Sequence, residues 1–422
     1  MYDQSFNLKT INRELRKSDF TFKPRLRDKS IKDREIEAAI VKGVGSWDIS
    51  KGLLASLIRG KHVYRAASFN DELLLRKLNR NLMQHANLRT LSRDSIIANI
   101  NQLLREGIEY RVYRLDIKSF YESIDTQHAL ALIEKLTLIS QPTKKHLKNI
   151  LDFHIASRRT GVPRGLALSA TITEIVMQDF DCAIEELGGV FYYARYVDDI
   201  IVITDRTERP FKFLKFIKKN LPEGMHLNTK KQIICETRGD VVSRDLGSPS
   251  VEELDFEYLG YRFVVEPPLR DRKKRDNQLY RDVTLDIAKS KVKKTKTRLA
   301  RSLLTFNSLG NFKLLQSRIK FLASNFSVMD ADRDRKRLAG IYYNYHRIDP
   351  ERSKSLIELD TYLIKIISSG SGKISDDFYS KTTLRQRREL LTISFSRGFR
   401  KKIFLHYSNS RLGEIQECWK YV

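Results

Sequence analysis

The chain has 422 residues, 41% of them hydrophobic, which is enough for two or three domains with proper cores. Its 78 Lys and Arg outweigh 52 Asp and Glu, and the net charge of +26 disfavours a typical metabolic enzyme and predicts a polyanionic partner, most simply nucleic acid. With no long apolar run and no signal-peptide pattern in "MYDQSFNLKTINRELRKSDF", we expect a soluble, cytoplasmic protein without a membrane partner.

The three cysteines, Cys182, Cys235 and Cys418, lie far apart and show no CxxC spacing. A disulfide framework or a zinc site is therefore disfavoured, and we expect buried, inert thiols.

The N-terminal hundred residues show mainly helical patterns. We predict helices over "REIEAAIVKGV" (34–44) and "ISKGLLASLI" (49–58), then two amphipathic helices between 71 and 106. A β-rich run, "EYRVYRLDI" (109–117), predicts a strand. Asp125 is a good N-cap for a helix that starts at 126.

Loops and strands then alternate with helices up to about residue 265. "GVPRGLALS" (161–169) is a Gly/Pro loop before the helical "ATITEIVMQDFDCAIEEL" (170–187). The stretch "YYARYVDDIIVI" (192–203) predicts strand, turn and strand. An amphipathic helix over 208–222 precedes the strand-like "HLNTKKQIICET" (226–237).

The character of the sequence changes after "FEYLGYRFVVEPP" (256–268). Residues 270–301 are strongly basic, the chain then reads as helices to about 369, and a "GSG" linker near 370 precedes a final basic, helical segment. We therefore predict a domain boundary between 266 and 285.

Three carboxylates lie at the ends of predicted strands or in the turn between them. Asp116 ends a predicted strand, and Asp198 and Asp199 occupy a predicted hairpin turn. Converging carboxylates are unstable unless a cation lies between them, and two Mg²⁺ ions would satisfy that need and support an in-line phosphoryl displacement. The alternative is a solvated hairpin turn, which the Asp-Asp pair alone would favour. The +26 charge, the strand context and Asp116 together favour the metal site.

At this point the sequence resembles the reverse transcriptases. "RLDIKSFYESID", "GVPRGLALSATITE", "YVDD", "HLNTKKQI" and "FEYLGYRF" are similar to their motifs A to E and occur in the family's order over roughly 110–265. The upstream "KHVYRAASFNDELLLRKLNRNL" is similar to the fingers region, although less clearly. The basic helices from 285 to about 369 suit a thumb that grips a duplex.

The resemblance implies roles for the three acids and their neighbours. Asp116 and Asp198 would bind both metal ions, Ile117 would lend its backbone carbonyl, and Asp199 would support the site. Lys231 matches the motif D lysine that protonates the leaving pyrophosphate. Lys230 is its close rival, and either lysine is alternatively plain surface charge.

The resemblance also implies residues that contact the nucleotide. Tyr121 lies five residues after Asp116, where the family carries an aromatic steric gate against a 2′-OH, which implies deoxynucleotide substrates; the alternative is core packing. Pro163 and Gly165 would shape the motif B loop, and Arg65 is the fingers candidate for the triphosphate. Arg164 replaces the usual motif B glutamine, so it either restricts the template or nucleotide or forms a salt bridge to an acid such as Glu174.

Other departures narrow the resemblance. The motif B loop carries "LAL" in place of small polar residues, no "VTG" follows motif E, and neither a maturase–nuclease extension nor a spaced acidic set for RNase H chemistry is present. Retron, group II intron and retroviral identities are disfavoured. The chain resembles bacterial defence-associated, abortive-infection-like reverse transcriptases, and its start and its tail from "FSRGF" are similar to the smaller subunit of a two-polymerase antiphage system.

We therefore predict an α+β right-hand polymerase with fingers and palm, a helical thumb and a short helical C-terminal extension. The predicted parts are an N-terminal basic extension (1–60), fingers and palm (61–266), thumb (267–369) and C-terminal extension (370–422). The expected function is Mg²⁺-dependent, RNA-directed DNA synthesis from deoxynucleotides (dNTPs) in antiphage defence.

The resemblance further implies a structured non-coding RNA as template or scaffold, a DNA product, and a second reverse transcriptase subunit or another oligomer. Two alternatives stay open. One is a template-independent or protein-primed DNA polymerase, and the other is a catalytically idle RNA-binding scaffold.

Overall fold

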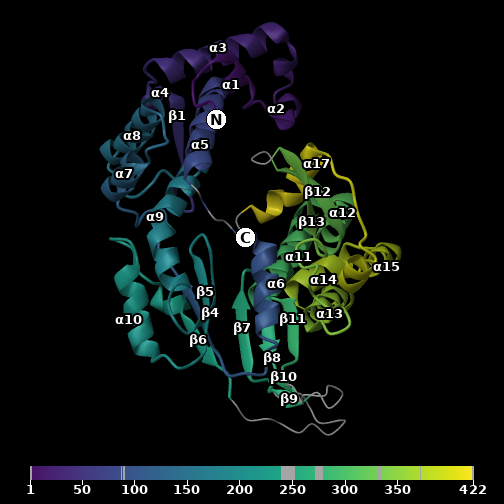
Figure 1. The fold of residues 1–422 in the computed structure, drawn as a ribbon. Helices are drawn as coiled ribbons and strands as arrows, with labels where there is room; N and C mark the ends of the chain where they lie inside the picture. The colour runs from purple at the N-terminus through teal and green to yellow at the C-terminus, as the bar shows by residue number, and fades with distance from the viewer. Residues whose placement is uncertain are drawn as a thin grey trace. The chain divides into compact units, whose positions relative to one another are not determined.

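The computed structural model describes residues 2–86, 88, 91–238, 252–270, 279–330, 334–370 and 372–420 (Figure 1). The chain forms two compact units, each assembled from separate stretches of sequence. The first contains residues 1–92, 110–236 and 331–334, and the second contains 93–109, 237–330 and 335–422. The predicted parts of the chain were continuous, whereas both units are discontinuous. Residues 271–278 of the predicted basic stretch lie outside the described residues.

The first unit begins with helices and a β-hairpin whose first strand is largely exposed. Its elements are α1 (Leu8–Asn12), α2 (Lys17–Phe22), η1 (Pro24–Arg27), α3 (Lys29–Val44), α4 (Ile49–Gly52), β1 (Leu53–Ile58), β2 (Lys61–Ala66) and α5 (Phe69–His85). The structure confirms the helix predicted over 34–44. It shows that the helix predicted over 49–58 is wrong, because only its first turn is helical and Leu53–Ile58 pairs antiparallel with Lys61–Ala66. Arg59 and Gly60, both at positive φ, close this hairpin.

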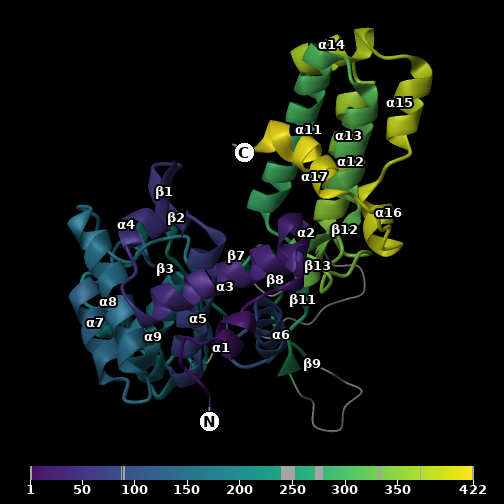
Figure 2. The same cartoon turned by 90° about the horizontal axis from the view of Figure 1, so that it is seen from above.

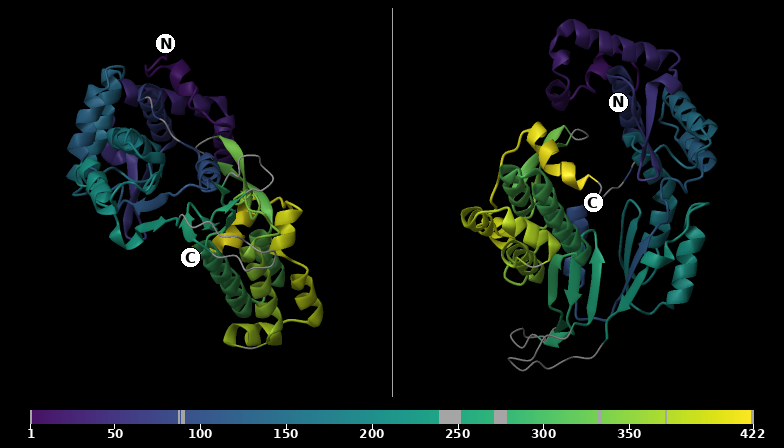
Figure 3. Two further views of the ribbon diagram at one scale, coloured as in Figure 1. Left: turned by 60° about the horizontal axis from the view of Figure 1, so that its bottom comes forward. Right: turned by 180° about the vertical axis from the view of Figure 1, so that it is seen from behind.

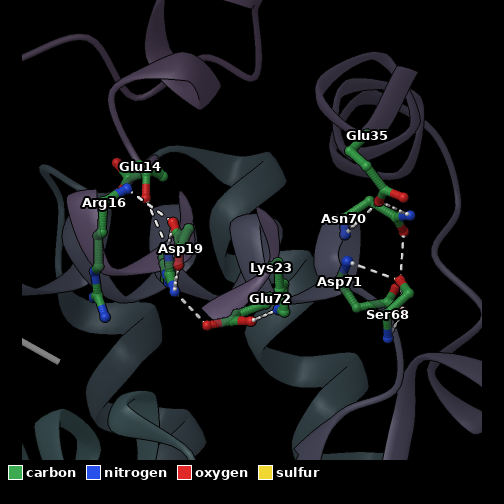
Figure 4. A network of polar contacts seen from close by, with 10 residues as sticks. Glu14, Arg16, Asp19, Lys23, Glu35, Ser68, Asn70, Asp71 and Glu72 are labelled. Atoms are coloured by element: carbon green, nitrogen blue, oxygen red, sulfur yellow. Dashed lines mark hydrogen bonds and ion pairs between the residues drawn. The ribbon is translucent and has the colours of Figure 1, made fainter. Parts of the chain in front are cut away.

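A polar network fastens the N-terminal helices to α5 (Figure 4). The Arg76 guanidinium donates to both carboxylate oxygens of Asp19 at 2.7 and 2.8 Å and also pairs with Glu72. Glu72 in turn accepts from Lys23 at 2.7 Å. Because the Arg76 and Asp19 side chains are less than a tenth exposed, this ion pair joins α2 to α5 largely out of contact with water.

A four-stranded antiparallel sheet forms the centre of the same unit. Its strand order is β4 (Val190–Tyr196), β5 (Asp199–Thr204), β3 (Arg111–Asp116) and β6 (Ile233–Glu236). The Ile200–Ile203 run of β5 is at most 1% exposed, which explains its uninterrupted apolar sequence.

The helices of this part are α7 (Thr126–Lys135), α8 (Gln141–Ala156), α9 (Ala167–Glu185) and α10 (Pro210–Asn220), with the short η2 (Thr229–Lys231) before β6. The α9 helix packs against β4, and α10 reaches β3 through the contact of Phe213 with Tyr113. Asp125 caps α7 as predicted, because its carboxylate accepts from the Gln127 backbone N–H. The α10 helix lies beside the sheet (Figures 1 and 3).

The second unit combines a small sheet with a helical bundle. The sheet has the strand order β11 (Val283–Ile287), β8 (Tyr261–Val265) and β7 (Leu254–Tyr258). The unit also contains α6 (Arg93–Leu103) and a short pair of strands, β9 (Leu269–Arg270) and β10 (Leu279–Tyr280). The helices α11 (Lys289–Leu309), α12 (Phe312–Ala323), α13 (Lys354–Ser368) and α14 (Lys373–Ser380) pack together (Figure 2).

The chain then ends in short helices, which are α15 (Leu384–Leu391), α16 (Phe395–Arg400), α17 (Asn409–Gln416) and η3 (Glu417–Trp419). The prediction of uninterrupted helices up to 369 is wrong for one segment, because β12 (Asn325–Asp330) and β13 (Arg335–Gly340) form an antiparallel hairpin. The buried Asn325 side chain explains this break in the helices. Its amide oxygen accepts from the Tyr342 backbone N–H at 2.8 Å, and its amide nitrogen donates to the Ile403 carbonyl at 3.1 Å.

The cysteines are free thiols, as predicted, but the prediction that they are buried is wrong. Cys182 is exposed, and Cys235 and Cys418 are half-buried. Desolvation raises the pKa of Cys235 to about 12. Among the described residues, no helix is long and apolar enough to cross a membrane.

Candidate active site

The three predicted aspartates lie at one end of the central sheet. Asp116 is the last residue of β3 and stands opposite Asp199, the first residue of β5, in the antiparallel register. Asp198 belongs to the two-residue turn that joins β4 to β5, and its backbone carbonyl accepts from the Ile117 N–H at 3.0 Å. The pairing of two strands far apart in sequence therefore brings these carboxylates together.

Burial and mutual repulsion mark the site electrostatically. Burial raises the pKa of Asp198, and the nearby charge of Asp116 raises it further. The pKa of Asp199 is raised by burial and by the charge of Asp198, although the Arg114 guanidinium at 3.8 Å opposes the shift. A cation between the carboxylates would relieve both effects.

The segment before β6 supplies two partners for Asp116. The Lys231 ammonium donates to one carboxylate oxygen at 2.8 Å, and the Asn228 side-chain amide donates to the other at 2.9 Å. The hydrogen bond to Asp116 raises the pKa of Lys231, so this lysine is protonated at neutral pH. Its rival Lys230 is exposed, and the observed contact with Asp116 is made by Lys231.

The Tyr121 ring is in contact with Arg164, a residue of the motif B loop. The Arg164 guanidinium carbon is 5.0 Å from the centre of the Tyr121 ring, a cation–π geometry. The Nε and Nη2 atoms of Arg164 each donate to one carboxylate oxygen of Glu122, both at 3.2 Å. The acid that pairs with Arg164 is thus Glu122, whereas Glu174, the acid suggested from sequence, is bound by Arg195.

Glu122 also contacts the β1–β2 hairpin. The Nζ atom of Lys61, the first residue of β2, lies 3.1 Å from Glu122 Oε2, the oxygen that also accepts from Arg164 Nη2. Burial alone would raise the pKa of Glu122, but hydrogen bonds from Lys61 and Arg164 hold it below its ordinary value. Glu122 is therefore an ionised bridge between the hairpin and the motif B loop.

Gly165 allows that loop to approach β2 closely. It has a φ of +99°, and an added Cβ would lie 2.5 Å from the Tyr64 carbonyl oxygen and 2.6 Å from a methyl carbon of Val63. The Tyr64 backbone N–H donates to the Arg164 carbonyl at 2.7 Å, which fixes the register of this contact. A side chain at position 165 would displace the loop from the hairpin.

The remaining predicted residues take different positions. Ile117 is buried directly after Asp116, and its backbone forms an isolated bridge with Leu227. Pro163 accepts a hydrogen bond from the Ser169 hydroxyl at 2.6 Å, which supports the loop. Arg65 is exposed on β2 opposite Leu54, so it belongs to the hairpin and not to the aspartate cluster.

Sequence reasoning missed several polar residues around the site. Asn228, Glu122 and Lys61 gave no spacing signal, because each lies in a segment whose pattern is equally typical of surface charge. Arg114 lies in the predicted strand 109–117, but its place beside Asp199 depends on strand pairing. Arg195 was visible in the quoted "YYARYVDD", where an arginine in an otherwise apolar strand is the one usable signal.

The donor set suits a cation that is completed by its substrate. In the part of the chain that the structure describes, no group of three or more His, Cys, Asp or Glu side chains lies close enough to hold a metal ion by itself. Mg²⁺ is commonly held by one or two carboxylates, waters and substrate phosphates, a pattern that Asp116 and Asp198 fit.

Comparison with known proteins identifies the domain that carries this site. Residues 61–263, a little under half of the chain, match the family model described as reverse transcriptase (RNA-dependent DNA polymerase). Over this range the chain is similar to the reverse transcriptase family, and the three aspartates lie within the matched residues. The mixed helix and sheet architecture is that of a right-hand polymerase.

Whole-chain comparisons add little. No curated protein matches the chain. Among solved structures, telomerase from Candida albicans in complex with a TWJ fragment of telomeric RNA matches at 11% identity and a TM-score of 0.32. The match covers 87% of this chain and 61% of the telomerase chain, and this low similarity supports no inference about function.

Proposed function

We propose that the protein is an RNA-directed DNA polymerase that adds deoxynucleotides at the Asp116–Asp198 site. The observation that carries the proposal is the junction of β3 and β5, where Asp116, Asp198 and Asp199 meet within a domain that matches the reverse transcriptases. Buried carboxylates that repel one another are typical of sites built for divalent cations and phosphate chemistry.

In this proposal Asp116 and Asp198 hold two Mg²⁺ ions, with help from the Ile117 carbonyl, and Asp199 supports the cluster. Bound Mg²⁺ supplies the charge that stabilises the attacking 3′-oxygen and the leaving pyrophosphate. Lys231, already protonated beside Asp116, donates a proton to the leaving group as the incoming phosphates replace its carboxylate partner.

The nucleotide-contacting residues belong to the same proposal. The Tyr121 ring would occupy the volume that a 2′-OH requires, so the substrates are dNTPs. Gly165 would let the loop lie close to the nascent base pair, and Arg65 on the hairpin would bind the triphosphate. Arg164 would hold the Tyr121 ring in place through its bond to Glu122.

Primer extension on a defined RNA template tests the activity. We expect Mg²⁺-dependent synthesis of complementary DNA by the wild type and a loss of at least about 10³-fold in Asp116→Asn and Asp198→Asn. Asp152→Asn, an exposed carboxylate of α8 in the same unit, is the matched control and should keep full activity. Undiminished extension in either site variant would refute the assignment of the metal site.

The same assay separates the alternatives. Product that is independent of the added template would favour a template-independent or protein-primed polymerase, and RNA binding without any synthesis would favour an idle scaffold. The three aspartates and Tyr121 are all present, which supports the active enzyme.

We also propose a biological setting, supported by the sequence resemblance alone. The protein would act in antiphage defence with a structured non-coding RNA as template or scaffold and with a second reverse transcriptase subunit. Sequencing the nucleic acid that co-purifies with the protein tests the RNA partner. Plaque counts on cells that carry wild type or Asp198→Asn test the defence role, and equal counts would contradict it.

A further inference from the structure

The turn that presents Asp198 has an unfavourable backbone conformation. Val197, the first residue of this turn, has a φ of +62°, in the left-handed region. A β-branched side chain rarely adopts this conformation, because its Cβ substituents crowd the backbone. Such a conformation persists only where the surrounding structure holds it in place.

Arg195 makes the contact that holds this turn. Its side chain is 4% exposed, and its Nη1 donates to the Val197 backbone carbonyl at 3.1 Å. The Ile117 N–H holds the neighbouring Asp198 carbonyl from the β3 side at 3.0 Å. The turn is therefore fixed at two successive carbonyls, one by a backbone group and one by a side chain.

Two acids of α9 fix the position of the guanidinium. Asp181 accepts from Arg195 Nε at 2.8 Å and from Nη2 at 2.7 Å, while Glu174 accepts from Nη2 at 2.7 Å and from Nη1 at 3.2 Å. The Tyr193 hydroxyl donates to the same Asp181 oxygen as Nε does, at 2.5 Å. Because the planar guanidinium is held on two edges, its Nη1 can point in only one direction.

The electrostatics agree with a permanently charged anchor. Burial by itself lowers the pKa of Arg195, but the hydrogen bonds and charges of Asp181 and Glu174 more than offset this effect and hold its pKa above the ordinary value. The anchor thus keeps its positive charge.

We propose that Arg195 is a positioning residue that holds the strained Val197 turn and thereby fixes the position of the Asp198 carboxylate near Asp116. This inference rests on the proposed polymerase function. It assigns to α9 a direct part in the geometry of the metal site, through the contacts from Asp181 and Glu174 to Arg195 and from Arg195 to the Val197 carbonyl.

The test measures polymerisation as a function of Mg²⁺ concentration. In Arg195→Gln we expect kcat to fall about 10- to 100-fold and the half-saturating Mg²⁺ concentration to rise, while KM for the nucleotide changes little. Arg195→Lys keeps the charge but not the two-edged contact, so it should recover only part of the loss. Glu174→Gln, a milder change that keeps the arginine, should shift the Mg²⁺ curve in the same direction.

Val197→Gly distinguishes positioning from mere stability. Glycine adopts a positive φ without steric penalty, so a turn with glycine at this position depends less on being held. We therefore expect Arg195→Gln to cause a smaller loss of kcat in the Val197→Gly background than in the wild-type background. An equal loss in both backgrounds, with all variants folded, would overturn the proposal.

Arg111 provides a matched control. It is also a buried arginine held by two carboxylates, Glu208 and Glu236, but it lies at the opposite end of β3 from Asp116. Arg111→Gln should lower stability without shifting the Mg²⁺ curve. An inactive wild type would refute the polymerase function itself, whereas an active wild type with an unshifted Arg195→Gln curve would refute only the positioning role.

Discussion

The aspartates at the junction of β3 and β5 repel one another, and a single substitution should reveal the size of that effect. Asp198→Asn removes one buried charge, so in the absence of divalent ions we expect unit 1 to become more stable and its Tm to rise. Added Mg²⁺ should raise the Tm of the wild type, and it should raise the Tm of the variant much less. Thermal unfolding with and without Mg²⁺ measures both effects, with Asp152→Asn as control. A variant that is less stable than the wild type without metal would contradict the repulsion.

Tyr121 offers a second prediction at the scale of single residues. Tyr121→Val removes the ring that Arg164 covers, so we expect the ratio of ribonucleotide to deoxynucleotide kcat/KM to rise about tenfold or more. Glu122→Gln weakens the anchor of Arg164 and should raise the ratio less. Single-nucleotide incorporation with matched ribo- and deoxynucleotides measures this ratio. An unchanged ratio in Tyr121→Val would show that the ring is simply part of the core.

Lys77 of α5 predicts a pH dependence of stability. Its ammonium is buried, with the side chain 1% exposed, and donates to the Asp3 carbonyl at 2.6 Å. Burial lowers its pKa to about 8, below the unfolded value of about 10.4, so the folded state bears the penalty of a buried charge in full below pH 8. The penalty disappears as the pH rises from about 8 to above 10.

Lys77→Met removes this penalty but also loses the hydrogen bond to Asp3. We expect the variant to be more stable than the wild type by about 2 kcal/mol near pH 7, with the difference shrinking toward pH 10. Urea unfolding of both proteins between pH 7 and pH 10 measures the difference in their free energies of unfolding. Contributions from other titrating groups are the same in both proteins and cancel in this difference. A difference that does not vary with pH would refute the lowered pKa.

At the scale of elements, the C-terminal helices are part of the core of unit 2. Trp419 packs with Phe321, Phe326 and Ile415, and its indole N–H donates to the Arg298 carbonyl at 3.0 Å. We expect Trp419→Ala to cost about 3–5 kcal/mol in the stability of this unit. Chemical denaturation followed by near-UV circular dichroism measures the loss, and Tyr379→Ala, on the exposed side of α14, is the control. A loss below about 1 kcal/mol would show that the segment is an independent extension.

Elements were predictable where the periodicity was long and the caps were strong. The α5 and α7 helices follow from amphipathic patterns and from Asp125 as N-cap, and β5 follows from its short apolar run after the Asp-Asp turn. The "GLLASLI" run misled because its apolar residues fit either period, and pairing with Lys61–Ala66 decides for the strand. The β12–β13 hairpin depends on the buried amide of Asn325, a tertiary feature that no local pattern shows.

Some features of the site could be predicted from the sequence and others could not. The register of β3 against β5 places Asp116 opposite Asp199 and so brings together acids that the sequence motifs had singled out. The partner of Arg164 was not predictable, because Glu122, Glu174 and Asp181 are equally acidic in sequence and only the folded loop decides which arginine each one meets. Their roles in catalysis stay predictions until the variants are measured.

At the scale of the whole molecule, the net charge of +26 predicts binding to nucleic acid that weakens steeply with salt. Each phosphate neutralised should add about −0.7 to −0.9 to the slope of log K against log salt. The basic helix α11 is our candidate for a large share of these contacts. Two of its lysines are engaged, since Lys289 pairs with Asp255 at 2.9 Å and Lys296 pairs with Glu358 at 2.5 Å.

Lys293 of the same helix is exposed, so its charge faces solvent and is available to a phosphate. We expect Lys293→Glu to flatten the salt slope by about one phosphate equivalent, and Lys296→Glu to flatten it less, because Lys296 already shares its charge with Glu358. Fluorescence anisotropy with labelled RNA and with an RNA–DNA duplex, at several salt concentrations, gives both slopes. Lys218→Glu on α10, in the other unit, is the control for the loss of charge alone. If all three variants flatten the slope equally, the net charge and not the α11 surface governs binding.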